Sequence, residues 1–258
     1  TFEDFEKARY RIAFEELLTL QTALLMMKYS VKTDNRGISF DIDEKIEDLL
    51  NTLPYTLTNA QLRVWHEIDL DMKSQNCMNR LVQGDVGSGK TAVAMLALYK
   101  ACRNGYQAAM MAPTSILAKQ HYLYLSKMLE PFGIKCELFT SELTKKKKEQ
   151  LIEELKNGKI NIAIGTHALI EENIVFQNLG LVITDEQHRF GVRQRGILSS
   201  KGTRPDVLVM TATPIPRTLA MILYGDLDIS IIDELPPGRQ KIETYAVRRN
   251  LEDRKSVV

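Results

Sequence analysis

The sequence predicts an α/β fold with a mostly parallel sheet, helices on both faces of the sheet, and one long N-terminal helix before it. From residue 58 onward, short apolar segments bounded by turns alternate with longer helical segments. Such alternation is typical of a parallel sheet that is buried on both sides. Residues 3–29, by contrast, are rich in Glu, Lys, Ala and Leu and contain no Pro or Gly, which favours a single helix.

The N-terminal helix is expected to pack against other structure. Its aromatic and leucine side chains between Phe14 and Leu25 spread over more than one face, so we expect burial on several sides. A turn cluster at 34–37 ends this unit, and a short helix at about 43–51 follows it.

The α/β part is predicted to contain six strands separated by helices. The expected strands are 79–82, 108–112, 135–139, 160–165, 179–184 and 207–211, and the expected helices are 91–104, 115–129, 144–157 and 217–224.

The composition and net charge of the chain exclude few classes of function. The chain has 258 residues, 44% hydrophobic and 26% charged, with a formal net charge of +1, so any basic footprint for nucleic acid has to be local. The longest apolar segment, 92–99, is too short to cross a membrane, and we expect no membrane partner. Three widely spaced cysteines, Cys77, Cys102 and Cys136, argue against a disulfide framework or a zinc site and fit a reducing cytosol.

A glycine-rich turn follows the first predicted strand of the α/β part. Gly84, Gly89, Lys90 and Thr91 match the pattern GxxxxGK[ST]. Glycines let backbone amides wrap phosphates, and the helix that begins near Lys90 adds its N-terminal amides and dipole. The Lys90 ammonium is expected to reach the β- and γ-phosphates and the Thr91 hydroxyl to ligate Mg²⁺. The predicted nucleoside triphosphate site comprises Gly84, Asp85, Val86, Gly87, Ser88, Gly89, Lys90 and Thr91.

A second acidic site is predicted where the apolar strand 179–184 ends. This strand delivers Asp185 to the carboxyl edge of the sheet, where open α/β sheets bind ligands. Asp185 is expected to hold Mg²⁺, directly or through water, and Glu186 to polarise the attacking water as general base. The acidic pair at the end of this strand is a specific indication of an NTPase when it occurs together with the glycine-rich turn at 84–91, here called the phosphate loop, because each site requires the other. His188 is interpreted as a sensor of nucleotide state; an exposed loop histidine is the simpler alternative.

The order of the remaining segments resembles superfamily 2 helicases along one RecA-like domain. The segments similar to motifs Ia, Ib, II and III are 112–118 (APTSILA), 165–169 (GTHAL), 185–188 (DEQH) and 210–214 (MTATP). Three longer segments resemble the RecG branch-migration helicases, and the match covers about residues 55–245: 185–191 (DEQHRFG), 211–219 (TATPIPRTL) and 226–239 (DLDISIIDELPPGR). Transcription-repair coupling translocases share PIPRTL but usually carry Asp-Glu-Glu-Gln in the acidic motif, so the sequence favours the RecG family.

The resemblance implies an ATP-dependent DNA helicase that remodels forks and branched double-stranded DNA in replication-fork rescue, recombination and repair. It implies ATP and Mg²⁺ as cofactors, branched double-stranded DNA as partner, a monomeric full enzyme, and the bacterial cytosol or nucleoid as location. It assigns the coupling of nucleotide state to DNA to His188, Thr211, Ala212 and Thr213. Gln61 resembles the upstream glutamine that reads the adenine edge; a solvated residue is the alternative.

DNA contacts are implied on the same domain. The resemblance places Pro113, Thr114, Thr166, His167 and Arg193 on the nucleic-acid face, where hydroxyls and main-chain amides contact phosphates. Arg189 and Arg195 are further candidates, and a solvated basic loop explains these arginines almost equally well. The family pattern Thr-Gly-Ser is replaced at 140–142 by Thr-Ser-Glu, and the glutamate would repel phosphate. Lysines 145–148 favour a solubilising helix over a DNA role.

The resemblance also divides the chain. Residues 1–53 are expected to be the long helix and a linker from an upstream domain, 54–235 the ATP-binding domain, and 236–258 a linker and the start of a second motor domain. The chain begins without Met and ends after a charged stretch, so we expect an excised fragment. Without the arginine finger of a second domain, which contributes ~10³–10⁵ in rate at related sites, the fragment is expected to be nearly inactive. An ATP-gated switch or scaffold is the alternative function.

Overall fold

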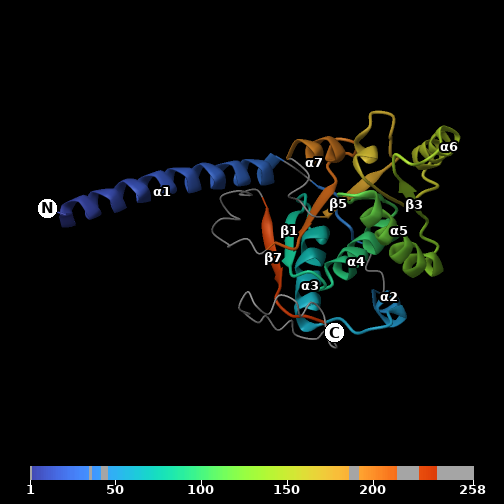
Figure 1. Cartoon of the computed structure of the whole chain (residues 1–258), viewed down its shortest axis with the longest axis horizontal. Helices are drawn as coiled ribbons and strands as arrows, with labels where there is room; N and C mark the ends of the chain where they lie inside the picture. Colours follow the sequence, from blue (N-terminus) through green and yellow to red (C-terminus); the bar gives the residue numbers. More distant parts are fainter. Residues whose placement is uncertain (1, 35–36, 42–45, 186–191, 214–226, 237–258) are drawn as a thin grey trace, which may run out of the picture.

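The computed structural model describes residues 2–34, 37–41, 46–185, 192–213 and 227–236. Within these residues, seven parallel strands form one sheet in the order β3-β4-β2-β5-β6-β1-β7 (Figure 1). The strands are β1 (Asn79–Gly84), β2 (Gln107–Met111), β3 (Cys136–Phe139), β4 (Ile162–Gly165), β5 (Leu179–Asp185), β6 (Asp206–Thr211) and β7 (Asp228–Ile232).

Helices cover both faces of this sheet, as predicted. The helices are α1 (Phe2–Asp34), α2 (Ile46–Thr52), α3 (Asn59–Lys73), α4 (Lys90–Arg103), α5 (Ser115–Leu129), α6 (Lys145–Lys156) and α7 (Val192–Ser199), with 3₁₀ turns η1 (Glu130–Phe132) and η2 (His167–Ile170). Helices α2 to α5 pack on one face and α6, α7 and η2 on the other. Side chains of successive strand residues point to opposite faces of the sheet, so the helices on each face pack against apolar side chains. The predicted α/β class, a parallel sheet with helices on both faces and a long N-terminal helix before it, is therefore confirmed.

Helix α4 lies at the centre of the larger layer. Every residue from Ala92 to Ala101 is buried, because α4 packs on the sheet with α3 on one side and α5 on the other (Figure 1) and also contacts α2. A helix that is apolar all round requires such a place. This burial holds the N-terminus of α4 firmly at the carboxyl edge of the sheet.

Helix α1 corrects one prediction. It is longer than expected and projects from the rest of the chain (Figure 1), and its described side chains are largely exposed, including Phe14 at 55% and Leu17 at 52%. The expected burial on several sides is wrong for this chain, because no other described element lies along the helix. Local pairs such as Lys7–Glu3 at 2.8 Å add a few tenths of a kcal/mol of helix stability at most.

Other differences are local. Strand β7 and the helices α3 and α7 were not predicted. Gln61 lies in the first turn of α3, which begins at Asn59. Strand β1 continues to Gly84, because Gln83 and Gly84 pair with residues of β7. The predicted helix at 217–224 lies outside the described residues.

Asp206 begins β6 at the amino edge of the sheet, away from the predicted motifs. Its Oδ1 accepts a hydrogen bond from the Met78 amide at 2.7 Å, whereas its buried Oδ2 has no partner among the described residues. Burial, helped by the nearby charge of Asp71, raises the pKa of Asp206 well above its usual value. The charged form is therefore costly in the folded state.

Asp206→Asn is expected to stabilise the fold at neutral pH. Because the folded-state pKa is raised above the unfolded value of about 3.9, the parent chain loses stability as pH rises from about 4 through the folded pKa. The amide avoids this loss, so we expect a gain on the order of 1 kcal/mol at pH 8 that vanishes near pH 4. Urea unfolding at both pH values checks this, with the exposed Glu149→Gln as control. A pH-independent difference would refute it.

Candidate nucleotide and nucleic-acid site

The carboxyl edge of the sheet collects the predicted motifs. In the neighbouring strands β5, β6 and β1, Asp185 pairs with Met210, and Thr211 pairs with Gln83 just before the phosphate loop. On the other side of β5, β2 leads to Pro113 and β4 leads to Thr166. Because parallel strands end on one edge, the predicted nucleotide residues and the predicted DNA-contacting residues lie along the same edge of the sheet.

The phosphate loop turns tightly between β1 and α4. Gly87 and Gly89 have φ of 79° and 84°, a left-handed conformation that glycine adopts without steric cost. The Ser88 amide donates to the Asp85 carbonyl at 3.0 Å, and α4 begins directly after Gly89. The loop therefore surrounds the N-terminus of a helix, where unpaired amides and the helix dipole favour anions.

Lys90 lies across this loop. Its Nζ donates to the carbonyl oxygens of Gly84 at 2.6 Å and Asp85 at 2.9 Å, and only 9% of the residue is exposed. The ammonium is thus held beside the amides that would surround a phosphate. Thr91, the next residue, lines the cavity beside the loop.

Asp185 lies at the end of β5, on the face that α4 and α5 cover, since Leu181 and Ile183 of the same strand belong to that core. Its Oδ2 is 2.8 Å from Nε2 of His121 on α5. Both residues are buried, with 9% and 8% of their surfaces exposed. His121 was not predicted, and no local sequence pattern indicates it, because the contact arises only when α5 packs on the sheet.

The oxygen donors at this edge suit Mg²⁺. A threonine hydroxyl and an aspartate carboxylate are hard oxygen ligands, and Mg²⁺ usually takes only one or two protein ligands together with phosphate and water. No group of three or more His, Cys, Asp or Glu residues that could hold a metal ion occurs in the described part of the chain. Thr91 and Asp185 therefore fit a magnesium ion that arrives with a triphosphate.

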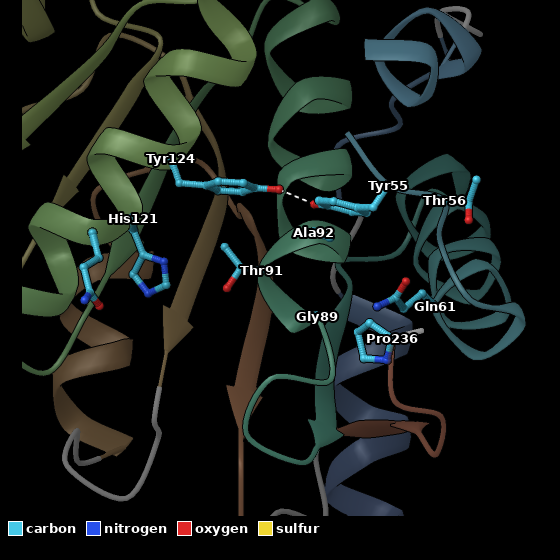
Figure 2. Close-up of a pocket in the computed structure, with 10 residues that line it drawn as sticks. Tyr55, Thr56, Gln61, Gly89, Thr91, Ala92, His121, Tyr124 and Pro236 are labelled. Carbon is cyan, nitrogen blue, oxygen red and sulfur yellow. Dashed lines mark hydrogen bonds between the residues drawn. The ribbon is translucent and has the colours of Figure 1, made fainter. Parts of the chain in front are cut away.

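A cavity of about 420 Å³ opens beside the N-terminus of α4. Figure 2 shows Tyr55 and Tyr124 pointing toward each other from opposite sides of α4, with their hydroxyls hydrogen-bonded. Burial and this hydrogen bond raise the pKa of the Tyr124 hydroxyl. The lining residues are Tyr55, Thr56, Gln61, Gly89, Thr91, Ala92, Gln120, His121, Tyr124 and Pro236.

Gln61 borders this cavity, and the solvated alternative is wrong because only 2% of the residue is exposed. Its Oε1 accepts from the Thr58 amide at 2.9 Å, completing a capping box at the start of α3. Its Nε2 donates to the Ser88 carbonyl at 2.8 Å. A side-chain amide can make about four hydrogen bonds, so two sites remain for a ligand. Adenine recognition by Gln61 stays a prediction.

The segment after β6 is folded on itself. The Thr211 and Thr213 hydroxyls are 2.9 Å apart, and the Thr213 amide donates to Thr211 Oγ1 at 3.2 Å. Thr211 is buried, Ala212 is half-buried and Thr213 is exposed. Glu186 and His188 lie outside the described residues, so the predicted base and the predicted coupling through His188 remain untested.

The predicted DNA-contacting residues stand at the ends of β2 and β4. Thr114 Oγ1 accepts from the Leu117 amide at 3.3 Å and so caps α5. Pro113 and Thr166 are half-buried, and His167 is exposed. The backbone of Arg193 lies in α7; its side chain, that of Arg195, and all of Arg189 lie outside what the structure describes.

The four lysines at the start of α6 divide into two groups. Lys148 pairs with Glu171 at 2.5 Å, which ties the first turn of α6 to the segment that follows η2. Lys145, Lys146 and Lys147 are exposed. The pairing joins the start of α6 to the end of η2, the turn that Thr166 precedes. Glu142 on the loop before α6 is exposed and carries the opposite charge.

Known proteins resemble this chain over nearly all of its length. The family model for the DEAD/DEAH box helicase matches residues 58–222. The ATP-dependent DNA helicase RecG of Bacillus subtilis is 49% identical over 98% of this chain and 37% of its own length. That of Thermotoga maritima is 50% identical over 96% of this chain and 32% of its own length. The chain thus spans about a third of these relatives.

A solved structure of RecG bound to a three-way DNA junction has a TM-score of 0.86 and 47% identity, covering 98% of this chain and 34% of that one. None of the described helices has the length and apolar character that a membrane crossing requires. The chain belongs to the DEAD/DEAH box helicase family, and its resemblance to the RecG helicases is confirmed.

Proposed function

We propose that residues 54–235 are the ATP-binding domain of a motor that moves on and remodels branched double-stranded DNA, and that 1–53 and 236–258 connect it to flanking domains. One observation carries the proposal. The phosphate loop and Asp185 share a sheet edge with Thr114 and Thr166, which stand at the ends of the neighbouring strands. ATP and a DNA backbone would therefore bind side by side. The relative solved on a three-way junction supports this substrate class.

The roles of the site residues follow from their chemistry. Lys90 and the loop amides would hold the phosphates, and Thr91 and Asp185 would hold Mg²⁺, which neutralises phosphate charge when bound. Glu186 would act as the general base. Gln61 and the ring of Tyr55 would hold the base in the 420 Å³ cavity, because adenine offers both an aromatic face and a hydrogen-bonding edge.

The exposed lysines at the start of α6 allow a direct test of the DNA surface. Fluorescence anisotropy with a labelled three-way junction should show binding that weakens with salt. A plot of log K against log salt concentration has a negative slope, and each lost phosphate contact should reduce the magnitude of that slope by about 0.9. Changing Lys145, Lys146 and Lys147 together to alanine should therefore reduce the magnitude by about 1–3.

A matched control removes three other positive charges. Lys127, Lys156 and Lys159 are exposed and lie near the opposite edge of the sheet, so their change to alanine should leave the slope nearly unaltered. Equal effects of the two triple variants would reject the assigned DNA surface. Absence of salt-sensitive junction binding by the parent chain would reject the motor function and favour an ATP-gated switch.

A further inference from the structure

His121 reaches the acidic motif from a different element. It lies in α5, 64 positions from Asp185 in the sequence, and its Nε2 is 2.8 Å from Asp185 Oδ2. Both residues are more than nine-tenths buried. Since a carboxylate only accepts hydrogen bonds, Nε2 must carry the hydrogen in this contact.

The contact orients the Asp185 carboxylate. An aspartate side chain at a strand end can rotate, and a hydrogen bond to one oxygen limits the directions in which the other can point. Ligating carboxylates in metal sites are commonly held in this way, and loss of such a partner typically costs about 10–100-fold in metal affinity.

The imidazole also borders the nucleotide cavity. His121 and Thr91 line the same cavity, and Figure 2 shows the ring on the α5 side with Thr91 on the α4 side. A histidine that only helped to pack α5 on the sheet would not need to lie between Asp185 and this cavity. Its position points to the metal and phosphate chemistry of the site.

We propose that His121 is a positioning residue, which holds the Asp185 carboxylate in the orientation that binds the Mg²⁺ accompanying ATP. The proposal rests on the proposed function, since it requires ATP and Mg²⁺ at this edge. It adds a residue of α5 that contacts no reacting atom but sets the affinity for the metal.

Calorimetric titration of ATP into the 258-residue chain, once with excess Mg²⁺ and once with EDTA, tests this. Mg²⁺ should raise the ATP affinity of His121→Leu about 10-fold less than it raises that of the parent chain. The ATP affinity measured in EDTA should be the same for both. His121→Gln should retain the gain, because its Nε2 can take the place of the imidazole Nε2. His66→Leu, an exposed histidine on α3, is the matched control and should behave as the parent chain.

Each other outcome is decisive. If His121→Leu and His121→Gln both keep the parent's Mg²⁺ gain, or both lose it equally, the positioning role is wrong. If the parent chain binds no ATP, or binds it equally well without Mg²⁺, the proposed function and the role of His121 fall together. Thermal unfolding verifies that each variant is folded, and His121→Ala replaces His121→Leu should the latter not fold.

Discussion

Lys90→Met is expected to weaken the binding of MgATP by about 100-fold. Hydrogen bonds to charged groups contribute about 1.5–3 kcal/mol each, and 1.4 kcal/mol corresponds to a factor of ten, so losing one or two phosphate contacts gives this size. Methionine keeps most of the aliphatic stem, which is buried in the parent chain, so the fold should survive. Calorimetry with MgATP measures the effect.

A second lysine provides the comparison. Lys119 is an exposed residue of α5, and Lys119→Met should leave the affinity for MgATP within about twofold of the parent value, as expected for an exposed charge. If Lys90→Met binds MgATP as tightly as Lys119→Met does, the ammonium of Lys90 does not contact the phosphates and the assignment of the loop is wrong.

Gly165→Ala is expected to destabilise the fold by about 3 kcal/mol, the upper end of the range for overpacked cores. Gly165 ends β4, and an added Cβ would lie 2.2 Å from the Phe139 carbonyl oxygen of the neighbouring strand β3. A backbone oxygen cannot rotate away, so the two strands would have to separate. Urea unfolding at pH 7 measures the loss.

Gly196→Ala is the same chemical change in open space. It lies within α7, and its added Cβ would meet no atom within 4 Å from the other elements that the structure describes. Alanine should raise stability there by about 0.5–1 kcal/mol, because it is the better helix former. Similar losses at both glycines would show that the close approach of β3 and β4 does not explain the cost at Gly165.

Much of the fold could be predicted because its signals are local. The central strands are continuous apolar segments, and α4 and α5 follow turn or capping residues directly. Strand β7 was not predicted. It lies at the edge of the described sheet, and the polar and apolar residues from Asp228 to Ile231 alternate out of step with burial, since Ser230 is buried and Ile231 is exposed. The burial of α1 was wrong because an apolar sequence shows that a helix needs cover, but not whether this chain supplies it.

The candidate site also contains both residues that the sequence predicted and residues that it did not. Residues 84–91 and Asp185 each belong to a short continuous motif, and the structure places the two motifs at one edge of the sheet. His121 and Tyr124 could not be predicted, since their partners Asp185 and Tyr55 are 64 and 69 positions away. Contacts of this kind depend on how two elements pack, which no short sequence pattern encodes.

The capping of α5 by Thr114 has a mechanical consequence. The N-cap of this helix is a predicted DNA contact, and about two turns later the same helix carries the contact to Asp185. A helix transmits displacement along its axis as a nearly rigid rod, so a shift imposed at Thr114 reaches the carboxylate. By thermodynamic reciprocity, any factor by which DNA alters metal affinity through α5 is the factor by which the metal alters DNA affinity.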